Sequence, residues 1–234
     1  MKTLLMCIFC STLLISNSTN VLGQDTFQSY DSKEELESDV KEIIRAFDLY
    51  MRDMGIEPPY IPTVNIQTGP FLIKWDEPNK GIILPIWDEL FDEQQEIFKT
   101  LKGENAEEFF ISLFNWFLIP HELGHFINPM DDSLSPYNRE RAANEFAVAF
   151  FLSQKENQKK MDYVEKSLPE AFALLPKIDF NNLTEEEYFN NNYTKLGGNP
   201  NAYGYFQFKF IMDIINNKED IDLLYYFGRE NNEL

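Results

Sequence analysis

Residues 109–125 decide the fold of this chain, and they read FFISLFNWFLIPHELGH. The stretch up to residue 119 is apolar apart from Ser112 and Asn115, and it is too short to span a bilayer. A helix that is apolar on every face is typical of the buried centre of a domain. Pro120 removes one helix hydrogen bond, so we expect a kink just before the pentapeptide 121–125.

The pentapeptide 121–125, HELGH, contains the only two histidines of the sequence. Imidazoles four residues apart lie on one face of a helix, a spacing that lets both bind a single metal ion. Glu122, beside the first histidine, is then placed to act on a water molecule at that metal. The sequence therefore predicts one zinc ion held by His121 and His125, with Glu122 as the catalytic base.

The N-terminal residues have the composition of a secretory signal peptide. Lys2 gives a positive start, an apolar run covers residues 4–15, and Val21 and Gly23 are small enough for a signal-peptidase site. We predict a signal peptide at 1–23. The mature chain is then secreted or periplasmic, and no membrane anchor is expected because the apolar run is too short to cross a bilayer.

The remaining composition limits the chemistry of the mature chain, which we predict to be a single domain at 24–234. Both cysteines, Cys7 and Cys10, lie in the predicted signal peptide, so a metal site must use His, Asp and Glu. The formal net charge of −19 argues against nucleic acid or anionic membranes as partners. Such acidity also keeps an exported protein soluble.

Hydrophobic periodicity predicts an α+β domain that is mostly helical, with a small N-terminal β-sheet beside the metal-binding helix. A capping box on Ser32 opens the first helix, which ends near Gly55, and Asn105 is a second predicted cap. The turn 77–81 predicts a hairpin between the second and third strands. The predicted strands are 61–67, 70–75 and 81–87, and the later predicted helices are 88–102, 136–157, 159–175, 184–195, 202–216 and 218–228.

The third metal ligand must be a carboxylate, since a catalytic zinc ion usually has three protein ligands and one water. Glu140 is the favoured candidate. Its helix presents alanines on the same face, and small residues allow close packing against the motif helix. Asn144, one turn later, is expected to hydrogen-bond a histidine ligand and fix its tautomer. The alternatives for the third ligand are Asp131, Asp132 and Glu145.

The motif at 118–125, LIPHELGH, and the segment 139–147, RERAANEFA, together resemble the gluzincin branch of zinc metallopeptidases. They are closer still to bacterial metallopeptidase families of unknown substrate. The resemblance implies a zincin-like fold, His121, His125 and Glu140 as zinc ligands, and Glu122 as catalytic base. Asn144 stands where many relatives have Asp.

The expected reaction is hydrolysis of a peptide bond in a peptide or protein substrate, with Glu122 passing the proton of the attacking water to the leaving amine. No histidine remains to stabilise the oxyanion, so a tyrosine is the natural donor. The candidate tyrosines are Tyr203, Tyr205 and Tyr137. An edge strand, 70–75 or 81–87, is expected to bind the extended substrate backbone.

Two other functions stay open at this point. The chain could be a catalytically inactive zinc-binding protein, or a metal-dependent amidase that acts on cell-wall peptides. Some proteins keep a motif of this kind after losing the catalytic activity, so the inactive alternative is retained.

Overall fold

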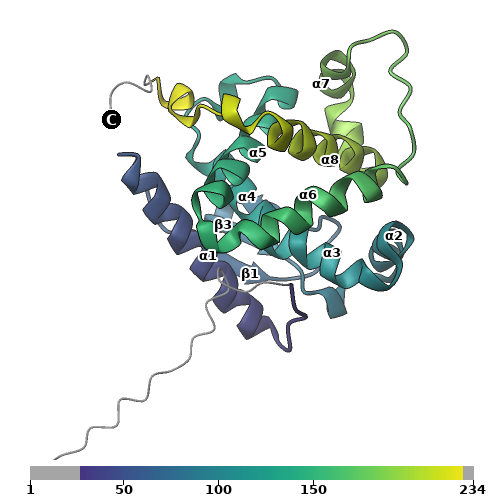
Figure 1. The fold of residues 1–234 in the computed structure, drawn as a ribbon, viewed down its shortest axis with the longest axis horizontal. Coiled ribbons are helices and arrows are strands. Elements are labelled where there is room, and N and C mark those ends of the chain that lie inside the picture. Colours follow the sequence, from purple (N-terminus) through teal and green to yellow (C-terminus); the bar gives the residue numbers. More distant parts are fainter. Residues whose placement is uncertain (1–26, 229–234) are drawn as a thin grey trace, which may run out of the picture.

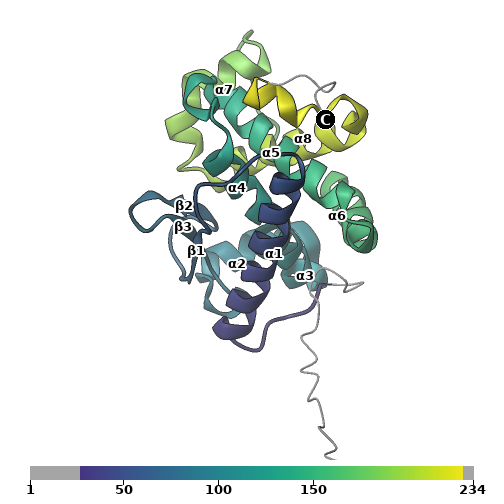
Figure 2. The same cartoon turned by 90° about the vertical axis from the view of Figure 1, so that its left-hand side faces the viewer.

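The computed structural model describes residues 27–228, so the predicted signal peptide lies outside the described residues. Helices make up most of the structure, and three short strands gather on one side beside α1 (Figures 1 and 2). This confirms the prediction of a mostly helical α+β chain. The helices are α1 (Lys33–Asp53), α2 (Asp92–Lys102), α3 (Ala106–Ser112), α4 (Leu118–Ile127), α5 (Pro136–Ser153), α6 (Gln158–Phe172), α7 (Glu185–Leu196) and α8 (Pro200–Asn216). Among the described residues, no helix has the length and hydropathy needed to cross a membrane.

Helix α1 begins after Ser32 and ends near Gly55 as predicted, but of the predicted capping box only the Ser32 bond forms, because the Glu35 carboxylate accepts from the N–H of Asp31. The hydroxyl of Ser32 accepts a hydrogen bond from the backbone N–H of Glu35, which satisfies one of the free donors at the helix start. Gly55, just beyond the helix, takes a positive φ of 72°, a conformation that glycine adopts without strain. The apolar face of α1 is buried and packs against α4 and β1. Its buried residues are Leu36, Val40, Ile43, Ile44, Phe47 and Met51.

The sheet contains β1 (Thr63–Ile66), β2 (Lys74–Asp76) and β3 (Gly81–Leu84) in the order β1-β3-β2. Strands β2 and β3 form the predicted antiparallel hairpin, whereas β1 pairs with β3 in parallel. Because β3 is paired on both sides, the prediction that segment 81–87 serves as a substrate-binding edge is wrong. Strand β2 overlaps the end of the predicted segment 70–75 and extends one residue beyond it. It is an edge strand and contacts α4.

The central helix is continuous from α3 through a five-residue π-helical segment, Leu113–Phe117, into α4. It is buried nearly all round, as predicted. The π-helical segment ends three residues before Pro120, and the Leu118 N–H that follows it bonds the carbonyl of Leu113. Proline removes a donor, and the wider π pattern redistributes the neighbouring hydrogen bonds.

Two local predictions are wrong. Asn105 makes no side-chain capping bond, because a short 3-10 turn, Gly103–Asn105, leads directly into α3. The predicted helix 218–228 is broken into two short 3-10 turns. Between these turns, the Asp222 carboxylate accepts hydrogen bonds from the backbone N–H groups of Leu224 and Tyr225, which competes with helical bonding.

Helices α4 and α5 pack against each other more extensively than any other pair of described elements. At their closest approach lies Gly124, in the middle of the pentapeptide 121–125. A Cβ atom added there would lie 3.0 Å from Cβ of Phe146 and 3.1 Å from Cα of Ala143. Both distances are shorter than ordinary van der Waals contact, so the absent side chain sets how near α5 comes to the motif helix.

We expect Gly124→Ala to lower the free energy of unfolding by about 1–3 kcal/mol, because the added methyl group overpacks the α4–α5 contact. This loss should outweigh the gain of up to ~1 kcal/mol that alanine offers over glycine inside a helix. Urea titration measures the difference. The matched control is Gly204→Ala in α8, where an added Cβ meets no atom within 4 Å and the stability should stay equal or rise. Equal effects of the two substitutions would contradict the role given to Gly124.

Candidate metal centre

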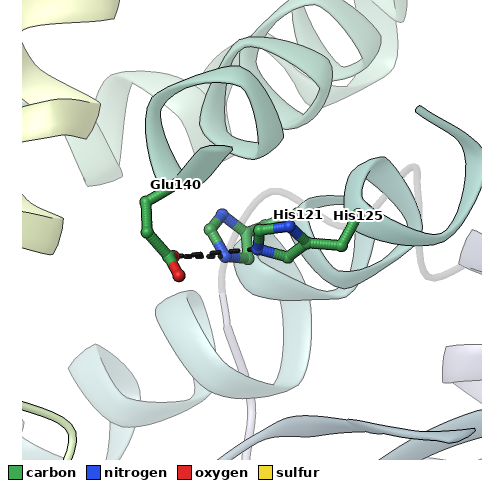
Figure 3. Close-up of side chains that lie close together, drawn as sticks. All are labelled: His121, His125 and Glu140. Atoms are coloured by element: carbon green, nitrogen blue, oxygen red, sulfur yellow. Dashed lines mark ion pairs between the residues drawn. The ribbon is translucent and has the colours of Figure 1, made fainter. Parts of the chain in front are cut away.

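Three side chains from α4 and α5 converge on one point. His121 and His125 project from successive turns of α4, and Figure 3 shows the Glu140 carboxylate pointing from α5 towards both imidazoles. The Oε2 atom of Glu140 lies 3.5 Å from Nε2 of His121 and 3.7 Å from Nε2 of His125. The potential ligand atoms all lie within 4.8 Å of one another. The structure thus brings together the three residues that the sequence favours as ligands.

The distances from Glu140 to the two histidines suit a metal ion of the size of zinc. Zinc bonds to nitrogen and oxygen at about 2.0–2.1 Å, which in a tetrahedron separates two ligand atoms by about 3.3–3.4 Å. The two histidine–carboxylate distances of 3.5 and 3.7 Å are only slightly longer. Two imidazoles and a carboxylate also match the donor set of catalytic zinc sites, which leave a fourth position open.

Glu140 is held by hydrogen bonds from two other helices. Its Oε1 accepts a hydrogen bond of 2.8 Å from the Tyr193 hydroxyl, and its Oε2 accepts one of 2.8 Å from Nε2 of Gln207. Burial alone would raise the pKa of the Glu140 carboxyl. The hydrogen bonds and charges of His121 and His125 nevertheless hold that pKa well below its usual range. The carboxylate is therefore ionised and oriented towards the histidines.

His125 has a second carboxylate partner on its other ring nitrogen. Its Nδ1 lies 2.9 Å from Oδ1 of Asp131, which turns Nε2 towards Glu140. Burial lowers the pKa of His125, but hydrogen bonds to Asp131 and Glu140 raise it overall to about 10. A carboxylate on the far nitrogen is the usual means of orienting a metal-binding histidine. The structure thus places Asp131 behind the ring and not among the three converging ligand atoms.

His121 differs from His125 in this respect. Its ring is buried and lies edge-on to the ring of His125 with the centroids 4.8 Å apart. Its Nδ1 is buried with no hydrogen-bond partner among the described residues. Packing around the ring and the Glu140 carboxylate on Nε2 therefore orient this imidazole, with no partner on Nδ1.

The remaining alternatives for the third ligand lie elsewhere. Glu145 points to another side of α5, where it accepts hydrogen bonds from Arg141 and from the hydroxyl of Tyr226. Asp132 lines the cavity beside the histidines but is not part of the converging cluster.

The prediction that Asn144 hydrogen-bonds a histidine is wrong. Its Nδ2 donates to the backbone carbonyl of Glu140 at 2.9 Å and to Oε1 of Gln207 at 3.0 Å. Asn144 faces α8 and not α4, so it orients the amide of Gln207, which in turn donates to the Glu140 carboxylate. Gln207 was not anticipated from the sequence. It lies between Phe206 and Phe208, which are both buried, and is itself 7% exposed.

Glu122 is buried in the same cavity as the three converging residues, with an exposure of 9%. Burial raises the pKa of its carboxyl, while the charges of the two histidines and the backbone N–H of Trp75 oppose that rise. Trp75 belongs to β2 and lines the same cavity, so the edge strand lies beside the expected catalytic base. A buried carboxyl with a raised pKa suits a group that accepts and returns a proton.

The structure brings one of the three candidate tyrosines to the site. Tyr203 lines the cavity, and burial together with the nearby charge of Glu140 raises the pKa of its hydroxyl well above the usual value. Tyr205 instead packs against Phe172 with the two rings tilted, since residues two apart in a helix point to opposite sides. Tyr137 directs its hydroxyl to Glu185 and lies outside the cavity lining.

Tyr193 was not anticipated from the sequence. It lies near the end of α7, and the guanidinium of Arg139 sits 5.3 Å from the centre of its ring. Arg139 also lies 3.9 Å from Oδ2 of Asp131, so one cation connects the two groups that contact His125 and Glu140. Nothing in the local sequence around Tyr193 distinguishes it from an ordinary half-buried tyrosine.

The cavity that holds these residues has a volume of about 1290 Å³. It exceeds the usual range for small-molecule sites, roughly 300–1,000 Å³, and so offers room for several residues of a peptide. It is bounded by α4, α5, α8 and the segment that leads into β2. The chain matches no protein-family model, no curated protein and no solved structure.

We expect Glu140→Ala to abolish stoichiometric zinc binding, because it removes the only carboxylate among the converging atoms. Asp131→Ala should keep the stoichiometry of one and weaken affinity by about 10- to 100-fold, as loss of a carboxylate behind a ligand histidine does. Glu145→Ala is the control and should change neither value. Metal analysis and competition with a chelator measure both. Loss of zinc in Asp131→Ala with retention in Glu140→Ala would reverse the ligand assignment.

Proposed function

We propose that this protein is an exported zinc-dependent peptidase of the gluzincin type, with a zincin-like domain. One observation carries the proposal. His121, His125 and Glu140 converge at spacings that suit zinc, and Glu122 is buried beside them in a cavity large enough for a peptide. The segment 1–23 supports export, since it has the composition of a signal peptide. The substrate is a peptide or protein, and nucleic acid is not a partner.

The chain's own residues divide the work of hydrolysis. His121, His125 and Glu140 would hold the zinc ion, which supplies polarisation of the scissile carbonyl and a lowered pKa for water. Glu122 accepts the proton of the attacking water and returns it to the nitrogen of the leaving amine. Its low exposure keeps bulk water away from that transfer.

The substrate backbone would run along β2. This strand is the edge of the sheet on the side of Glu122, and Ile73, Lys74 and Trp75 all line the cavity. Extended peptides bind such edges through main-chain hydrogen bonds, largely independent of their side chains. A peptide placed there would pass directly over the expected base.

Tyr203 is the proposed donor to the oxyanion. Its hydroxyl lies in the cavity close to both Glu140 and Glu122, whose charges contribute to its raised pKa. A neutral hydroxyl with a high pKa remains a donor throughout the physiological range. Tyr193 instead supports Glu140 through its own hydrogen bond of 2.8 Å.

We expect Glu122→Gln to retain zinc and to reduce kcat by about 10²- to 10⁴-fold, because the amide cannot accept a proton. Mass spectrometry of an unbiased peptide library measures cleavage, and metal analysis measures zinc. Glu104→Gln, an exposed position outside the cavity, is the control and should behave like the native protein. If the native protein cleaves no peptide, the inactive zinc-binding alternative gains. Release of an amide-linked cell-wall fragment would favour the amidase alternative.

We expect Tyr203→Phe to lower kcat by about 10²-fold with little change in KM, since an oxyanion donor acts mainly in the transition state. Tyr205→Phe is the matched control. It removes the same atom two residues away on the opposite face of α8 and should leave kcat unchanged. Equal rates for both variants and the native protein would exclude Tyr203 as the donor.

A further inference from the structure

The cavity has an apolar part that begins directly beside the metal ligands. Leu118 lies one turn before His121 on α4, so their side chains share a face of the helix. Leu118 is buried, and yet it lines the cavity together with apolar residues from four other segments. Apolar lining residues of this part include Leu72, Ile97, Leu113, Leu118, Phe208 and Ile211.

Helix α8 turns a single face to the cavity. Tyr203 and Gln207 lie at the polar end, where Gln207 donates a hydrogen bond to Glu140. Phe208 and Ile211, further along the helix, belong to the apolar lining. Gly204 also lines the cavity, four residues before Phe208 and seven before Ile211, and so stands on the same face as both. It marks the boundary between the polar and the apolar parts.

Neither the backbone nor the packing of the protein requires glycine at position 204. Its φ is not in the positive region, and an added Cβ would meet no atom within 4 Å. Glycine inside a helix is destabilising relative to alanine, so an unneeded glycine is unfavourable there. Gly124 differs from Gly204, because atoms of α5 occupy the space that a side chain at position 124 would need. At Gly204 the missing side chain leaves open space in the wall of the cavity.

We propose that Gly204 keeps open a subsite for a bulky apolar side chain of the substrate. The preferred substrate is then a peptide with a large hydrophobic residue next to the bond that is cut. This inference rests on the proposed peptidase function. Moving a side chain of Leu or Phe size from water into such a lining favours binding by about 10- to 150-fold.

Two hydroxamates test the subsite without any need for turnover. Acetohydroxamate and 3-phenylpropanohydroxamate share the group that binds zinc and differ in the apolar group. Calorimetric titration of the zinc-loaded native protein should show the phenyl probe binding at least tenfold tighter. Gly204→Leu should remove this preference and leave the affinity for acetohydroxamate within about threefold. Asn201→Leu, exposed on the same helix and outside the cavity lining, should keep the preference.

Peptide cleavage gives the second readout. The native protein should cut next to large hydrophobic residues in an unbiased library, and Gly204→Leu should shift the preference to small ones. Zinc content and the urea midpoint show whether each variant is folded. If Gly204→Leu is unstable, Gly204→Ala replaces it, with an expected loss of about fourfold for the phenyl probe, the effect of one methyl group.

The outcomes separate this inference from the proposed function. Equal affinities of the two probes for the native protein, or an unchanged preference in the position-204 variants, overturn the subsite even if peptides are cut. A preference that depends on Gly204, combined with no peptide cleavage by the native protein, supports the subsite and refutes the peptidase.

Discussion

The contact between α4 and α5 is the constraint on which the candidate metal centre depends. A glutamate side chain is short, so Glu140 reaches the two histidines only if its helix comes very near the motif helix. Gly124 and Ala143 allow α4 and α5 to come this close, because neither carries a side chain larger than a methyl group at the point of contact. The 3.5 and 3.7 Å distances from Glu140 to the imidazoles follow from this packing.

A buried ionised carboxylate is unfavourable unless it is hydrogen-bonded, and the structure supplies those bonds from outside the motif. Tyr193 of α7 and Gln207 of α8 each donate to one oxygen of Glu140. Asn144 then orients Gln207, and Asp131 orients His125. Four segments far apart in the sequence therefore hold the charge and geometry of one site. Such a network is rigid, which suits a site that must hold an ion in a fixed geometry.

Helix α8 connects this polar network with the apolar part of the cavity. Its cavity face carries Tyr203 and Gln207 towards Glu140, and Phe208 and Ile211 on the apolar side. The same helix thus supports Glu140, the candidate third ligand, and forms part of the wall of the space beside it. Gly204 lies where the two parts meet. The absence of a side chain there enlarges the cavity, and a Cβ added at this position would meet no atom within 4 Å.

The sequence by itself determined the elements that local periodicity and spacing encode. These are the capped helix α1, the β2–β3 hairpin, the buried central helix, and two histidines on one helical face with Glu122 between them. It also favoured Glu140 by its helix face, but it could not separate the roles of Tyr203 and Tyr205, place Asp131 behind His125, or find Tyr193 and Gln207. Those distinctions depend on distances between helices that are up to 67 residues apart in the chain. Only tertiary packing sets such distances, because no local pattern records which faces of α4, α5, α7 and α8 meet.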